Sequence, residues 1–206
     1  MPRRCSIMLS LFVLLCWTPP AGAQQPAANA LSASEAADGW ILLFDGRTLS
    51  GLLPTGDADW KVEDGTITAT MGTGFLATPR PYENFEFKTE VWIDQTANSG
   101  VFFRCGEGNP GARTCYEANI FDTHAEWPTG SINNLKTSKP NTPDTIGKWN
   151  TFEILANGNH LTIKVNGQTT ADVQDERLSS GTIALQEGGG GGMGLVRFRN
   201  VKVRPR

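Results

Sequence analysis

The chain has 206 residues, with 18 lysines and arginines against 21 aspartates and glutamates, which gives a formal net charge of −3. This mild acidic excess argues against a nucleic-acid-binding surface, because such surfaces need clustered positive charge. The length is enough for one domain with a substantial hydrophobic core.

Residues 1–23 have the features of a secretory signal peptide. Two arginines precede an apolar run from Ile7 to Trp17, and a small-residue sequence ends at Ala23. The run is too short to cross a membrane as a helix, and no later stretch approaches the necessary length. We therefore expect an exported protein, periplasmic or secreted, with no membrane span.

The domain expected over residues 38–206 follows a leader, residues 24–37, that is rich in Ala, Gln and Ser and would be flexible or at most a short helix. Within the domain, short segments that alternate apolar and polar residues are joined by turn sequences. These segments lie at 60–62, 66–68, 85–93, 101–104, 149–155, 161–165, 182–186 and 195–203. The pattern predicts an all-β fold, an antiparallel sandwich or barrel. The core candidates, chosen by their period-two placement, are Phe85, Phe87, Val91, Ile154, Ile163 and Val165.

Cys105 and Cys115 are the two cysteines that remain after removal of the expected signal peptide. They flank a short loop that contains Gly and Pro, and in an oxidising compartment such a pair is expected to form a disulfide. The bond would stabilise the fold by roughly 2–3 kcal/mol. Two free thiols are the alternative, whereas metal binding is disfavoured because the spacing is far from C-x-x-C.

The strand expected to begin at Cys115 carries unusually many polar residues. Successive side chains of a strand point to opposite faces, so Glu117 and Asn119 should share one face. One bulge residue after Ile120 would return Asp122 to that same face. Two carboxylates and an amide on one face suit a cleft that binds sugars, and a solvated polar face is the alternative.

Two segments lack strand patterning. Residues 123–147 are polar, Pro-rich and follow the polar strand directly, and a long loop inside a compact domain is usually functional. Residues 188–192 are five consecutive glycines, expected to form a loop between the last two strands. A phosphate-binding loop would require a helix after the glycines, and none is predicted there.

An ordered set of motifs resembles the 3-keto-disaccharide hydrolase domain family. The motifs are the run from Trp40 to Gly51, Asn98-Ser99-Gly100-Val101-Phe102-Phe103-Arg104, Tyr116-Glu117 through Asp122, Trp149-Asn150, Asn166-Gly167 and Phe198-Arg199-Asn200-Val201. The resemblance covers residues 39–203 and implies a concanavalin A-like jelly-roll sandwich of two antiparallel sheets. It also implies an exported bacterial protein whose concave sheet face holds carbohydrate of the 3-keto-glucoside type, with no partner protein evident.

Three positions depart from the family pattern. Asn119 stands where the family usually has Gln, and Asn133 stands where it often has Tyr. Glu187 leads into the glycine tract where the family often has His-Gly. A lost His on the concave face would remove a catalytic or metal-binding group, so carbohydrate binding without turnover is the alternative function.

The chemistry implied by the resemblance starts from a ketone at C3 of a glucoside, which makes the C2 proton acidic. A base removes this proton, the C1 oxygen leaves by elimination, and water then adds back. Glu117 is the candidate base, and Asp122 or His124 would serve the leaving group. Their alternatives are sugar binding by Glu117, turn capping by Asp122 and no chemical role for His124.

The developing enolate charge needs a partner as well. Arg104 could hold it, as could a divalent cation on Glu117, Asp122 and His124; no cofactor is otherwise expected. Asn119, Trp127 and Gln186 are the remaining candidates for substrate binding. A surface salt bridge is the alternative for Arg104, and the hydrophobic core is the alternative for Trp127.

A second class of enzyme shares part of this pattern. Glu117-x-Asn119-x-x-Asp122 resembles the Glu-x-Asp-x-x-Glu strand of laminarinase-type glycosidases. Those enzymes need two carboxylates about 5–5.5 Å apart. Asp122 is one methylene shorter than the Glu it replaces, so ordinary retaining hydrolysis is disfavoured.

Overall fold

A computed structural model of the chain describes residues 27–135, 144–188 and 194–206. The expected signal peptide lies outside these residues, as do the start of the leader and most of the glycine tract. No helix within the described ranges is long and apolar enough to cross a membrane.

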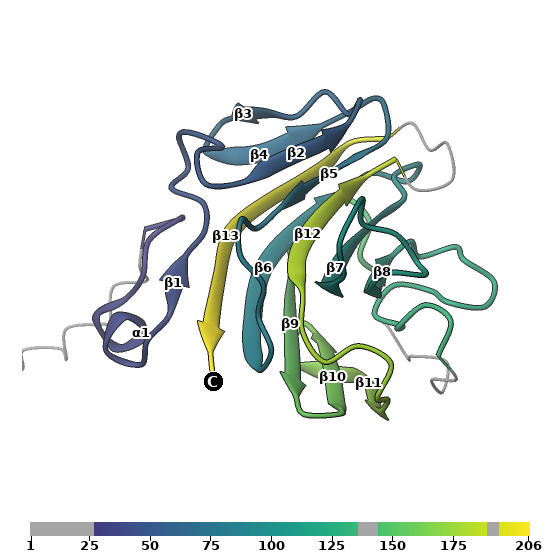
Figure 1. Cartoon of the computed structure of the whole chain (residues 1–206). Coiled ribbons are helices and arrows are strands. Elements are labelled where there is room, and N and C mark those ends of the chain that lie inside the picture. Colours follow the sequence, from purple (N-terminus) through teal and green to yellow (C-terminus); the bar gives the residue numbers. More distant parts are fainter. Residues whose placement is uncertain (1–26, 136–143, 189–193) are drawn as a thin grey trace, which may run out of the picture.

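The described chain forms two antiparallel sheets that pack face to face (Figure 1). The larger sheet has the order β11-β10-β9-β6-β13-β4-β3, with β1 paired to β13. Its strands are β1 (Ile41–Leu42), β3 (Lys61–Glu63), β4 (Thr66–Ala69), β6 (Phe85–Ile93), β9 (Asn150–Asn157), β10 (His160–Val165), β11 (Gln168–Gln174) and β13 (Val196–Pro205). The smaller sheet has the order β2-β5-β12-β7-β8. Its strands are β2 (Leu53–Gly56), β5 (Gly74–Ala77), β7 (Ser99–Cys105), β8 (Tyr116–Ile120) and β12 (Thr182–Glu187).

The hydrophobic core lies between the two sheets. Along β6, buried residues alternate with half-buried ones, as expected for a strand with one face in the core. All six core candidates from the sequence are buried, none with more than 1 % of its surface exposed. The predicted all-β jelly-roll sandwich is therefore confirmed.

Strands β7 and β8 are buried on both faces, unlike β6. One face of each strand belongs to the core. The other face lies on the outside of the smaller sheet, beside the loops drawn in teal that gather next to β7 and β8 (Figure 1). Loops therefore cover the polar strand that the sequence predicted, and the outer face of this strand is shielded from solvent.

The described part of the leader packs against the larger sheet. Helix α1 (Ala33–Ala37) is one short turn whose N-terminus is closed by a capping box between Ser32 and Glu35. Asn29 exchanges hydrogen bonds with Asn200 of β13, at 2.6 and 2.8 Å. Of the two expectations for this segment, the described residues contain the short helix.

Candidate functional site

The strand register places three predicted site residues on one face of the smaller sheet. Glu117 of β8 pairs with Phe102 of β7, and Asn119 pairs with Gly100. Gln186 of β12 pairs with Gly100 from the other side. Directly paired residues in antiparallel strands point to the same face, so Glu117, Asn119 and Gln186 all face outward from the core. The prediction that Glu117 and Asn119 share a face is confirmed.

The surroundings of these polar groups are apolar. A second hydrophobic cluster, separate from the main core, consists of Ala77, Phe102, Cys105, Cys115 and Ala184, with Phe75 packed against it. Phe75 and Phe102 meet edge to face with ring centroids 5.0 Å apart. Cys105 and Cys115 are joined by the predicted disulfide. This cluster lowers the local polarity beside Glu117.

Glu117 is the buried acid of this face, with 7 % of its surface exposed. Burial penalises the charged form and raises the pKa of Glu117 to about 7, while a hydrogen bond from the Asn133 side chain acts in the opposite direction. The side chain lies across the backbone of Gly100, where an added Cβ would sit 3.0 Å from Oε1. A carboxyl group that titrates near neutral pH is well matched to general acid–base catalysis.

A strand-like segment, residues 130–133, runs along the free edge of β8. The backbone N–H of Gly130 donates to the carbonyl of Asn119 at 2.8 Å, and the N–H of Asn133 donates to the carbonyl of Glu117 at 3.0 Å. The Ala118–Ile132 bridge between these bonds is antiparallel. The segment therefore places Asn133 beside Glu117. From the sequence, Asn133 stood out only as a departure from the family pattern. Its pairing with β8 was not predicted, because the loop has no strand-like alternation.

Two amide oxygens near Glu117 are buried without a hydrogen-bond partner among the described residues. They are Oδ1 of Asn133 and Oε1 of Gln186. An unpaired buried acceptor costs about 1–3 kcal/mol, so a ligand hydroxyl that donates to it would be favoured. Because both oxygens are buried, a ligand hydroxyl would reach them only after neighbouring side chains move.

Asn119 and Trp127 fasten the loop after β8 to the sheet. The Asn119 side-chain amide donates to the backbone carbonyl of Trp127, and Asn119 is 2 % exposed. The Trp127 ring is partly buried and lies 5.4 Å from the ring of His124. The contact of Asn119 is thus internal to the protein, and the substrate-binding roles predicted for both residues stay predictions.

Asp122 lies beyond the end of β8, and the pairing of β7 with β8 contains no bulge that would return it to the Glu117 face. Strand β8 ends at Ile120, and the Asp122 carboxylate accepts hydrogen bonds from the hydroxyls of Thr129 and Thr145 and from the backbone N–H of Thr145. These contacts occupy both carboxylate oxygens and correspond to the turn-capping alternative. Asp122 is therefore not supported as a catalytic group or as the second carboxylate of a laminarinase-type pair.

His124 is built into the same loop. Its Nδ1 accepts backbone N–H groups from Glu126 at 3.2 Å and Trp127 at 2.9 Å. Across the described parts of the chain, no group of three or more His, Cys, Asp or Glu side chains is arranged to hold a metal ion. The cation set proposed from the sequence, Glu117 with Asp122 and His124, does not assemble, so these residues do not fit a divalent cation.

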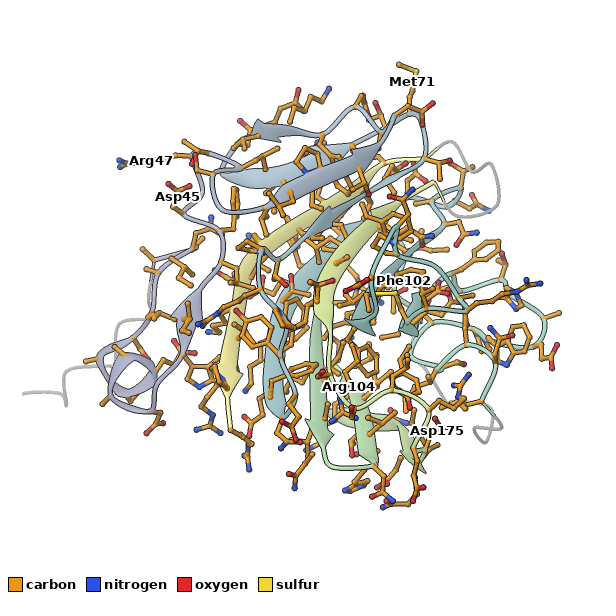
Figure 2. The ribbon with its side chains drawn as sticks, in the orientation of Figure 1. Asp45, Arg47, Met71, Phe102, Arg104 and Asp175 are labelled. Carbon is orange, nitrogen blue, oxygen red and sulfur yellow. A yellow bond between two sulfur atoms is a disulfide. The ribbon has the colours of Figure 1, made fainter. Side chains whose placement is uncertain are left out.

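Arg104 cross-links separate parts of the chain. Its guanidinium donates to the backbone carbonyls of Glu83, Gly158 and Leu178 at 2.8–3.0 Å, and only 1 % of the residue is exposed. Its backbone has a φ of +50°, which interrupts the alternation of β7. Figure 2 shows Arg104 at the end of the sandwich where Asp175 also lies. These contacts do not support the enolate-stabilising role predicted for Arg104, which stays a prediction.

Residues 39–204 match the family described as the 3-keto-alpha-glucoside-1,2-lyase-like domain. The chain belongs to this family. A relative from Bacteroides thetaiotaomicron named 3-keto-disaccharide hydrolase is 27% identical over 176 residues, which cover 69% of this chain and 60% of the relative. The chain thus spans less than two thirds of that relative's length.

Solved structures agree with the fold of this 3-keto-alpha-glucoside-1,2-lyase-like domain. A Parabacteroides distasonis protein described as a candidate glycosyl hydrolase matches with a TM-score of 0.76 at 23% identity, over 87% of this chain and 100% of that one. The carbohydrate-binding module CBM66 from Bacillus subtilis matches with a TM-score of 0.58 at 17% identity, over 73% and 94%. A β-glucanase from Bacillus licheniformis matches with a TM-score of 0.51 at 14% identity, over 76% and 93%. At these identities the three structures show the fold alone.

The burial of a second acid of this lyase-like domain was not predicted from the sequence. Glu187 ends β12 and is 2 % exposed, and its Oε2 has no hydrogen-bond partner among the described residues. Burial, followed by the negative charges of Asp59 and Asp94, raises the pKa of Glu187 to about 8. Successive residues of a strand face opposite sides, so Glu187 points away from the face that carries Gln186. Its position next to the glycine tract gave no indication of burial.

Proposed function

We propose that this domain cleaves 3-keto-glycosides or 3-keto-disaccharides, with Glu117 as the general base. The observation that carries the proposal is a single buried carboxyl group, with a pKa of about 7, on the outer face of the smaller sheet. Membership of the lyase-like family and the name of the Bacteroides thetaiotaomicron relative support the same substrate class. Elimination across C1 and C2 is the reaction that such a base would serve.

The proposed reaction begins with proton transfer from C2 of the sugar to the Glu117 carboxylate. The electrons of the C2–H bond form an enolate with the C3 ketone. Collapse of the enolate makes the C1–C2 double bond and expels the C1 oxygen, which takes up a proton and departs as an alcohol. Water then adds across the double bond, with its hydroxyl at C1 and a proton at C2, and releases the 3-keto sugar. The net result is hydrolysis of the glycosidic bond.

The remaining residues would bind the sugar or complete the proton transfers. Oδ1 of Asn133 and Oε1 of Gln186 are suited to accept hydrogen bonds from sugar hydroxyls. Phe75 and Trp127, both partly exposed, could contact the apolar face of a sugar ring. With Asp122 and Arg104 engaged elsewhere, His124 is the remaining candidate for protonating the leaving oxygen.

We also propose that the protein is exported to the periplasm or secreted. The Cys105–Cys115 disulfide supports an oxidising compartment. The signal sequence predicted over residues 1–23 would direct the export.

The deciding experiment incubates the purified protein with 3-keto-glucosides and with the parent glucosides and measures released sugar. Turnover of the keto substrates alone is expected. Glu117→Gln should lower the rate by about 10²–10⁴, because an amide keeps the size of the side chain but cannot accept the C2 proton. Glu126→Gln, an exposed position in the neighbouring loop, is the matched control and should retain the wild-type rate.

Two outcomes would reject this function. Wild-type turnover by Glu117→Gln would remove Glu117 from the reaction. Saturable binding of the keto-glucoside with no released sugar would identify a lectin-like binding module instead.

A further inference from the structure

Among the described residues, Asn133 contacts Glu117 through both its backbone and its side chain. The two residues lie on adjacent antiparallel segments, joined by the 3.0 Å bond from the Asn133 N–H to the Glu117 carbonyl. Their side chains meet as well, in a hydrogen bond between the Asn133 amide and the Glu117 carboxylate. Because a carboxylate only accepts, the Asn133 Nδ2–H group is the donor. Its Oδ1 is buried and has no hydrogen-bond partner among the described residues.

On the two neighbouring strands, the residues that share the face of Glu117 carry no charge. On β7 the adjacent residues are Gly100 and Phe102, and the next strand, β12, presents Ala184 and Gln186 in the same two rows. None of these four side chains carries a charge. Burial and the Asn133 bond are the two influences on the proton affinity of Glu117, with no charged group among them.

We propose that Asn133 is a positioning residue that holds the Glu117 carboxylate across Gly100 and favours its ionised, base-competent form. The inference rests on the proposed function only in naming Glu117 as the base. The contact between the two side chains is independent of what the substrate is. Asn133 also limits the effect of burial, because without its N–H the carboxylate would face an apolar cluster with no donor.

The test is a pH titration of Glu117 by ¹³C NMR, using the full protein labelled at glutamate side-chain carboxyl carbons and without substrate. The Glu117 signal is the one absent from the spectrum of Glu117→Gln. Asn133→Ala should bind the Glu117 proton about tenfold more tightly, which raises its pKa by about one. Asn133→Asp, which keeps the size but replaces the donor with a second carboxyl group, should raise it further. Asn157→Ala, at an exposed position at the end of β9, is the control and should leave it unchanged.

Kinetics on a 3-keto-glucoside give the second measurement. The acidic limb of the kcat/KM profile should move to higher pH in Asn133→Ala by the same amount as the NMR titration. An unchanged Glu117 titration in both Asn133 variants, in protein that keeps its β circular dichroism, would overturn the inference whatever the activity. A shifted titration in a protein that never releases sugar would keep the inference and reject the proposed function.

Discussion

At the scale of single residues, the described part of the chain contains two buried acids on opposite faces of one sheet. Glu117 and Glu187 have pKa values raised to about 7 and about 8, in both cases mainly by burial. A carboxyl group that keeps its proton in the folded state destabilises the protein at a pH where the unfolded chain would release it. For Glu117 this cost in stability is compatible with function, because a general base with a pKa near neutral pH is effective. Glu187 has no role in the proposed reaction.

Replacing Glu187 should therefore stabilise the fold at neutral and alkaline pH. The folded pKa lies above the ordinary value of 4.5, so the folded state holds more protons between about pH 4.5 and 8 and stability falls as pH rises through this window. Glu187→Gln should raise the free energy of unfolding by a few kcal/mol at pH 8 and change little at pH 4. Urea unfolding at both pH values measures this, with exposed Glu107→Gln as control. Equal gains at pH 4 and pH 8 would contradict the titration argument.

The sequence did not predict contacts whose partners come from distant parts of the chain. Arg104 stands in a family motif, but its acceptors lie on Glu83, Gly158 and Leu178. No local pattern indicates that these three separate segments converge there. The shared face of Glu117 and Asn119 was predicted correctly because the alternation of side chains along a strand is a local property of the sequence. The proton affinity of Glu117 was not predictable, because that depends on the cluster and loops that bury it.

At the scale of elements, the segments with strict alternation were predicted well and the irregular ones were not. The strand expected at 85–93 is β6 as observed. Strand β2 was not predicted because it contains Pro54, and proline within a sheet is confined mainly to edge strands. Strand β5 was not predicted because it has only four residues and no alternation of apolar and polar side chains. The expected bulge after Ile120 does not occur because the chain leaves the sheet there and enters the loop anchored by Asp122.

That anchoring makes a prediction for Asp122. Asp122→Ala removes the acceptor for Thr129 and Thr145, which lie on either side of residues 136–143. The free energy of unfolding should fall by about 1–3 kcal/mol, and amides near Thr129 and Thr145 should exchange faster with deuterium. Any remaining activity should keep the wild-type pH profile, because the Asp122 carboxylate is engaged by Thr129 and Thr145 and has no part in the proposed reaction. A changed profile with unchanged exchange would restore the catalytic role, and Glu126→Ala is the loop control.

At the scale of the whole molecule, the two-sheet architecture was predictable from many short alternating strands and turns, and the family resemblance specified the jelly roll. What the sequence could not provide was the way in which loops cover the outer face of the smaller sheet. The disulfide belongs to that covering, since both cysteines lie in the outer cluster with Phe102.

Removing the disulfide should loosen this face more than it unfolds the domain. Its cysteines are only 10 residues apart, so the Cys105→Ala/Cys115→Ala double variant should lose about 2–3 kcal/mol and remain folded. Intact-mass measurement of the exported wild type should show the bond, and thermal melts of the two proteins give the difference. Identical melting temperatures, or two free thiols in the exported protein, would contradict this prediction.

The pairing of residues 130–133 with β8 has a consequence for transplanting the site into another sandwich. A glutamate grafted onto the corresponding strand of a related jelly roll, without this segment and the outer cluster, would meet water and titrate near the ordinary value of 4.5. At neutral pH it would be ionised but a weak base. The raised pKa of Glu117 would therefore not be transferred with the residue alone, and the covering loop would have to be transferred as well.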